Sequence, residues 1–227
     1  MKIGKKISAT VVAVSLMIGA NSVANAQEQS AVKNPSAVTV EDGKQATKPL
    51  SQEKKSVVDK AIDSGSVKVA TEKKNLAVDK AITAENKEGQ TLVMIPIINV
   101  GSKYSNLTLV LDTSSKKVEA YKEAHFFEES ATAGRAVIWE DGKQIKDERV
   151  EATKEDLEKA NAEEGIGDAI SELNRCLSEA GIPAWIIAAA GFACSLASLP
   201  GYIACLVAAG VGGGTAGYCG ASAWSKL

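Results

Sequence analysis

The sequence contains a single histidine, His125, and none of its four cysteines forms a CxxC pair. The scarcity of histidine and the lack of a CxxC pair argue against a metal site, which would need His or Cys ligands at close spacing. The sequence also lacks a nucleophile elbow, a phosphate-binding loop, an HExxH motif and paired carboxylates of specific spacing. We therefore expect no metal, no cofactor and no enzymatic activity, and we interpret His125 as a packed or surface residue of a strand.

The net charge is small, and charged residues are absent from one part of the chain. The formal net charge is -2 at pH 7, so there is no basic surplus for binding nucleic acid. Nearly all charged residues lie before Arg175, and none lies between Ala180 and Ser225. The chain thus has a charged first part and a charge-free stretch over residues 180–225, which makes up most of its C-terminal tail.

The first 26 residues contain the three parts of a secretory signal peptide. Met1 to Lys6 includes three lysines, Ile7 to Ala20 is an apolar run, and Ala24-Asn25-Ala26 supplies the small residues that signal peptidase accepts. We expect residues 1–26 to be removed by cleavage between Ala26 and Gln27, which gives a secreted, extracellular chain. The alternative, an N-terminal membrane anchor, would need a longer apolar run of roughly 20 residues.

Polar segments with helical periodicity follow the signal peptide. Residues 27–50 have the composition of a disordered linker. Ser51 can cap a helix that stops at Gly65, and we predict a second helix over residues 72–84. Both segments contain the string Val-Asp-Lys-Ala-Ile, at 58–62 and 78–82, which either marks an internal repeat or reflects chance similarity.

Residues 89–152 change to a two-residue period rich in β-branched side chains. The pattern predicts an antiparallel meander of four or five strands, with the preceding helices covering one face. Asp141-Gly142 predicts a tight hairpin, and Pro96 favours an edge position for the first strand because proline lacks an N–H. The expected strands lie at 91–98, 107–111, 118–127, 136–139 and 143–145.

A polar joint separates these strands from the tail. Thr153 and the acids after it predict a helix start, and Glu163-Glu164-Gly165-Ile166-Gly167 interrupts the pattern at a place suited to proteolysis. The expected fold class is α+β. N-terminal helices and an antiparallel β-meander form a pro-region over residues 51–164, and a small disulfide-stapled all-α hydrophobic module follows over residues 165–227.

The tail predicts one amphipathic helix over residues 168–180 and apolar helical segments after it. The apolar segments fit a transmembrane hairpin, a soluble core held by disulfides, or a peptide that inserts into a target bilayer. The last interpretation accounts for both the cysteines and the lack of charge. Its expected membrane-active residues are Trp185, Ile186, Ile187, Phe192, Leu196, Tyr202 and Trp224.

The four cysteines, Cys176, Cys194, Cys205 and Cys219, all lie in the tail, and an even number in an exported chain predicts disulfides. Cys194 and Cys205 lie nearly symmetrically about a Pro-Gly turn at 200–201. We therefore favour a nested pairing, Cys194–Cys205 inside Cys176–Cys219. The rival pairing joins Cys205 to Cys219 across the glycines.

Short motifs in the tail carry a resemblance to a known family. They are Cys176-Leu177-Ser178, Gly181-Ile182-Pro183-Ala184-Trp185, Phe192-Ala193-Cys194, Cys205 and Tyr218-Cys219. Together with the order of signal peptide, polar pro-region and hydrophobic tail, they resemble the halocin-C-eight-like bacteriocin precursors, including secreted members from Gram-positive bacteria. The resemblance implies that the C-terminal peptide is released as a toxin and that the pro-region can serve as its immunity partner. The archaeal member has more cysteines, so the resemblance implies no particular pairing here.

The sequence as a whole predicts a secreted bacteriocin-like antimicrobial precursor whose C-terminal peptide permeabilises target membranes. Its expected partners are the membrane of target cells and its own pro-region, which would act as an immunity or solubilising partner in the same or another molecule. The alternative is a cell-surface binding module that the hydrophobic tail anchors in the producer's own membrane.

Overall fold

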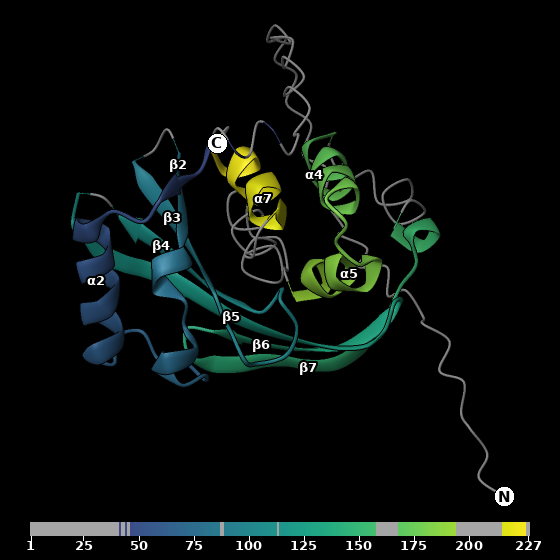
Figure 1. The fold of residues 1–227 in the computed structure, drawn as a ribbon, viewed down its shortest axis with the longest axis horizontal. Helices are drawn as coiled ribbons and strands as arrows, with labels where there is room; N and C mark the ends of the chain where they lie inside the picture. Colours follow the sequence, from purple (N-terminus) through teal and green to yellow (C-terminus); the bar gives the residue numbers. More distant parts are fainter. Residues whose placement is uncertain are drawn as a thin grey trace, which may run out of the picture. The chain divides into compact units, whose positions relative to one another are not determined.

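The computed structural model describes residues 41, 44, 46–86, 89–112, 114–157, 168–193 and 215–225, which belong to one compact unit. In this unit seven strands form one antiparallel sheet in sequence order, with helices against its two faces (Figure 1). The α+β class and the meander are confirmed, with more strands than the four or five expected. The cleavage site at Ala26 and Gln27 and the joint at 163–167 lie outside the described residues.

Each strand of the sheet pairs with its sequence neighbours, and the long strands bend around the C-terminal helices (Figure 1). Register shifts at Val110/Leu111, Glu128/Ser130 and Ile138/Trp139 supply local bends. The strands are β1 (Lys48–Pro49), β2 (Ile82–Glu85), β3 (Gln90–Pro96), β4 (Asn106–Asp112), β5 (Lys117–Ser130), β6 (Ala133–Glu140) and β7 (Lys143–Glu151).

Two local predictions are confirmed at the ends of elements. Helix α2 (Gln52–Asp63) begins where Ser51 Oγ accepts a hydrogen bond from the N–H of Lys54, at 3.3 Å. The β6–β7 hairpin turns at Asp141 and Gly142, whose φ angles are 49° and 77°. Two successive positive φ angles are what a type I′ turn requires, and its twist matches that of the strands.

The predicted helix over residues 72–84 is wrong. This segment forms two short 3₁₀ turns, η1 (Lys73–Asn75) and η2 (Val78–Lys80), and then strand β2. Residues 82–85 pair with residues 91–94 of β3, and Leu76 and Ala81 are buried against the sheet. Tertiary pairing thus overrides a weak helical pattern. The string Val-Asp-Lys-Ala-Ile is α-helical in α2 but forms a 3₁₀ turn and the start of a strand here, so it does not mark a structural repeat.

The edge position predicted for the first strand from Pro96 is also wrong, because β1 and β2 lie on the outer side of β3. Pro96 is the last residue of β3, and the pairing of β3 with β2 stops at Met94. The carbonyl of Pro96 accepts from the N–H of Ala77 at 2.9 Å, on the side where β2 has ended. The missing proline N–H therefore costs no bond of the β2–β3 ladder.

Three described helices follow the sheet. A helical turn begins after Thr153, as predicted. Thr153 Oγ1 accepts a hydrogen bond from the N–H of Asp156, and the Asp156 carboxylate accepts one from the N–H of Thr153. Helix α4 (Asp168–Glu179) confirms the predicted amphipathic helix, and Gly181 follows it at a φ of 80°. Helices α5 (Ala184–Ala193) and α7 (Thr215–Ser225) complete the set, and the sequence pattern did not predict α7.

The sheet separates two apolar layers. Its outer face packs against α2 and the segment before β2, through residues such as Val58, Val67 and Leu76. Its inner face packs against α4, α5 and α7. The helices of the hydrophobic tail thus share a core with the sheet. No helix within the described ranges is both long and apolar enough to span a bilayer.

Candidate functional site

The inner face of the sheet is the surface against which the tail packs, and we call it the tail-binding face. It consists of apolar side chains that alternate along the strands and are almost fully buried. Helices α4, α5 and α7 lie over this face of the sheet (Figure 1). Its members are Leu92, Met94, Ala124, Phe126, Ala136, Ile138 and Val150. Strict alternation places them on one face of the sheet.

Trp185 is the largest tail side chain buried on this face, with 0% exposure. Its ring lies edge-on to that of Phe126, with centroids 6.0 Å apart. Opposite the ring is Gly134 of β6, where an added Cβ would lie 2.3 Å from Cη2 and 2.5 Å from Cζ2 of Trp185. Gly134 therefore leaves the space that the indole ring fills.

Polar groups of the tail are incompletely satisfied in this packing. The indole Nε1–H of Trp185 and the hydroxyl of Ser222 are buried with no hydrogen-bond partner among the described residues. A buried tryptophan N–H usually finds an acceptor, and leaving it unpaired costs on the order of 1–3 kcal/mol. Apolar contacts thus hold these tail residues on the sheet, although two buried polar groups lack a hydrogen-bond partner there.

The loop between β3 and β4 ties the end of α4 to the sheet. The hydroxyl of Tyr104 donates to the carbonyl of Gly181 at 3.2 Å. The same loop is fixed to β5, because the N–H of Ser102 donates to the carbonyl of Phe126 and the N–H of Phe126 donates to Ser105 Oγ. The loop thus binds the backbone of Phe126, and Trp185 contacts its ring.

A disulfide joins α4 to α7. Cys176 and Cys219 are bonded across 43 residues, with their Cα atoms 5.9 Å apart and both side chains fully buried. This confirms the outer bridge of the favoured nested pairing and overturns the rival pairing of Cys205 with Cys219. The proposed inner bridge, Cys194–Cys205, lies outside the described residues.

The structure places the predicted membrane-active residues unequally. Trp185, Ile186 and Ile187 come together in α5 and are at most 2% exposed. Phe192 and Trp224 are described only as backbone positions of α5 and α7. Leu196 and Tyr202 lie outside the described residues. Sequence reasoning missed Gly134, whose only signal was a glycine between Ala133 and Arg135 in an otherwise regular strand.

A cluster of buried polar side chains lies on the outer face of β5. The carboxylate of Glu123, 1% exposed, accepts hydrogen bonds from the N–H groups of Ala70 and Thr71 at 2.6 and 2.8 Å. The same carboxylate lies 2.6 Å from Nε2 of His125, whose ring lies 4.6 Å from that of Trp139. His125 is packed, as predicted, and its cluster holds the segment before η1 against the sheet.

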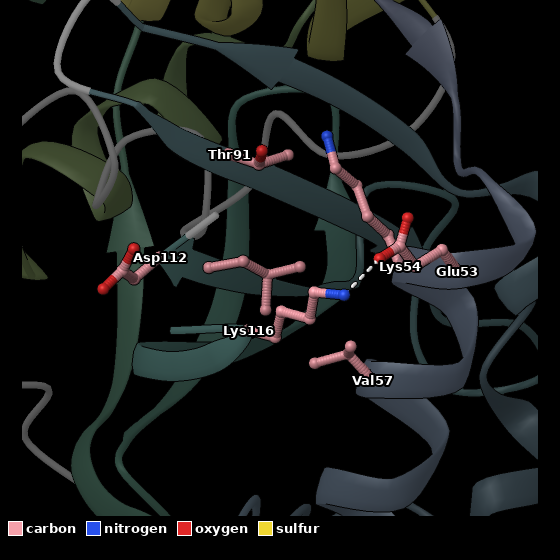
Figure 2. A pocket seen from close by; sticks show the side chains of 7 residues that line it. Glu53, Lys54, Val57, Thr91, Asp112 and Lys116 are labelled. Carbon is pink, nitrogen blue, oxygen red and sulfur yellow. Dashed lines mark ion pairs between the residues drawn. The ribbon is translucent and has the colours of Figure 1, made fainter. Parts of the chain in front are cut away.

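A small pocket lies between the start of α2, the start of β3 and the end of β4 (Figure 2). Lys116 reaches across it to Glu53 at 2.7 Å, and this pairing lowers the pKa of Glu53 and raises that of Lys116. Asp112 points away from the pair (Figure 2). The cavity of about 60 Å³ is far smaller than a typical ligand site.

The contacts described at these places are apolar packing, hydrogen bonds, one ion pair and one disulfide. Within the described part of the chain no cluster of His, Cys, Asp and Glu could hold a metal ion. Comparison with protein-family models, curated proteins and solved structures finds no match to this chain. The candidate site is therefore the tail-binding face together with the helices packed on it.

Proposed function

We propose that this chain is a secreted, bacteriocin-like antimicrobial precursor whose C-terminal peptide permeabilises target membranes. The observation that carries the proposal is the burial of Trp185, Ile186 and Ile187, in a helix without a single charged residue, against an apolar sheet face. Such a helix needs an apolar surface on all sides. In the precursor the sheet supplies part of that surface, and after release a bilayer would supply it.

The magnitude of the burial explains why release would drive insertion. Full burial of a large apolar side chain contributes roughly 1.5–3 kcal/mol. A peptide that loses the tail-binding face would expose these side chains to water, and it would recover this energy by entering a membrane or by self-association. We therefore propose that the pro-region acts as a solubilising or immunity partner that covers the peptide's apolar residues.

Two further features support export. The first 26 residues have the pattern of a signal peptide, and the Cys176–Cys219 bond fits an oxidising compartment. The proposal includes no metal, cofactor or catalytic step. It gives the chain two partners: the membrane of target cells and its own pro-region.

The test uses the full mature chain, from Gln27 to Leu227, with a specific protease recognition sequence inserted in the joint at 163–167. The oxidised chain is added to dye-loaded vesicles and to indicator bacteria before and after cutting. We expect leakage and growth inhibition only after cutting, because the uncut chain keeps Trp185 on the sheet. The matched control carries a scrambled recognition sequence and should stay inactive with protease present.

Absence of leakage and of inhibition at micromolar concentration after cutting would contradict the proposal. Fractionation of producing cells adds an independent check. A released peptide, detected by mass spectrometry in the medium, supports the proposal and gives the cleavage point. A full-length chain that stays in the membrane fraction would instead favour a surface binding module anchored by its tail.

A further inference from the structure

The charge of the released tail determines which lipid surface can attract it. Residues 165–227 contain three acids, Asp168, Glu172 and Glu179, and two bases, Arg175 and Lys226. Their formal sum is two minus three, or -1. An anionic bilayer attracts basic segments by about 1 kcal/mol per Lys or Arg near its surface. This tail has no basic surplus to use in that way.

The base in α4 is, moreover, already occupied. The guanidinium of Arg175 pairs with Glu172 one turn before it and with Glu179 one turn after it. These two carboxylates raise the pKa of Arg175, and the cluster of one guanidinium and two carboxylates has a formal charge of one minus two, or -1. A lipid phosphate would have to compete with two carboxylates for this guanidinium.

The residues of α5 favour a membrane surface without net charge. Helix α5 has no charged residue. Its Trp185 carries a buried indole N–H that lacks an acceptor on the sheet. Tryptophan is enriched at membrane–water interfaces, where the ring is apolar and the N–H meets a polar acceptor. The bilayer interface would thus satisfy the donor that the tail-binding face leaves unpaired.

We infer, on the basis of the proposed function, that the tail recognises zwitterionic lipid through apolar contact and the Trp185 indole, and does not recognise anionic headgroups by charge. The released peptide should then bind phosphatidylcholine at least as tightly as a mixture that contains phosphatidylglycerol. Binding should not weaken when salt is raised, since screening removes attraction between opposite charges and none is used here.

The experiment uses the full mature chain cut at its joint, with dye-loaded vesicles of phosphatidylcholine alone or with phosphatidylglycerol as a minor component. Binding is measured by flotation and permeabilisation by dye release, each at low and at physiological salt. The expected result is equal or stronger activity on phosphatidylcholine vesicles at both salt concentrations. A marked preference for phosphatidylglycerol that disappears with salt would overturn the inference and leave the proposed function standing.

A charge variant makes the test independent of the overall activity. Glu172→Gln with Glu179→Gln changes the formal charge of the tail from -1 to +1 and frees Arg175. At a surface potential of about -30 mV this should tighten binding to the phosphatidylglycerol vesicles about tenfold, with no change on phosphatidylcholine. The matched control, Glu172→Asp with Glu179→Asp, keeps the charge. The inference holds that the tail does not bind anionic lipid by charge because it has no basic surplus. If the Gln variant, which gains that surplus, shows an unchanged lipid preference, the inference is contradicted.

Trp185 is tested by its fluorescence in a variant with Trp139→Phe and Trp224→Phe. Lipids that carry a quencher near the headgroup should quench the emission of Trp185 more than lipids quenched deep in the acyl chains. Deep quenching alone would overturn its place at the interface. Failure of the cut chain to bind or permeabilise any vesicle overturns the proposed function and this inference with it.

Discussion

Gly134 and Trp185 form a contact in which one residue must lack a side chain so that the other can pack. The Cβ of Gly134→Ala would meet the Trp185 ring at 2.3 Å and the carbonyl oxygen of Phe127 at 2.7 Å. We expect the variant to lose about 1–3 kcal/mol of unfolding free energy, measured by urea denaturation. In a Trp185→Leu background the same substitution should cost less. An equal cost in both backgrounds would show that the indole is not the cause.

Glu123 is the residue whose loss should most disturb the outer face. Its carboxylate accepts two backbone N–H groups and contacts His125. Glu123→Gln should cost on the order of 2 kcal/mol, since a buried amide replaces a charged acceptor. Hydrogen exchange at the amides of Ala70 and Thr71 should also become faster. Glu128→Gln, at an exposed position of the same strand, is the control, and an equal effect there would contradict this role.

Residue roles could be predicted from the sequence only where they depend on near neighbours. Ser51 as a cap and Asp141-Gly142 as a turn were found because local bonds define them. The importance of Trp185 followed from its apolar surroundings in the chain. Glu123 and Gly134 were missed because their partners are remote; Thr71, for example, lies 52 residues from Glu123. No periodicity reports such a contact.

At the scale of elements, the same five-residue string takes two structures. Val-Asp-Lys-Ala-Ile forms part of α2 at 58–62, but a 3₁₀ turn and the start of β2 at 78–82. The first copy follows a capping serine. The second copy lies beside β3 and supplies the first residue of its partner strand β2, because an edge without a partner would leave backbone groups unpaired. Most strand positions were predictable from alternation, whereas β1, β2 and α7 depend on what they pack against.

The turn between β4 and β5 gives a prediction for pH dependence. Ser114 and Ser115 donate hydrogen bonds to Asp112 and lower its pKa from 3.8 to about 2. A lowered pKa means that Asp112 stabilises the fold above its unfolded pKa and that this stabilisation is lost as the pH falls through about 2. Asp112→Asn should therefore lower the urea midpoint at pH ~5 and have a smaller effect at pH ~2.

Carboxyl NMR titration of the wild-type protein checks the same prediction directly. The Asp112 signal should titrate well below those of exposed aspartates. A difference between wild type and variant that is the same at both pH values would contradict the prediction.

At the scale of the whole molecule, cutting the joint should turn an intramolecular contact into a bimolecular one. The tail helices and the sheet share one core, so their association in the cut chain should depend on concentration. We expect the Tm of the cut chain to rise with protein concentration and that of the uncut chain to stay constant. Scanning calorimetry at several concentrations measures this. A cut chain with a constant Tm would show that the tail contributes nothing to the stability of the sheet.

The bond between Cys176 and Cys219 also determines how the peptide would survive after it leaves. It closes a covalent ring that contains α5 and links α4 to α7. The joint at 163–167 lies outside this ring, so the cut that frees the peptide leaves the ring whole. An endoprotease that cuts once between the two cysteines would produce two pieces that remain linked. In a medium rich in proteases, such a ring tolerates a single cut that would split a linear peptide.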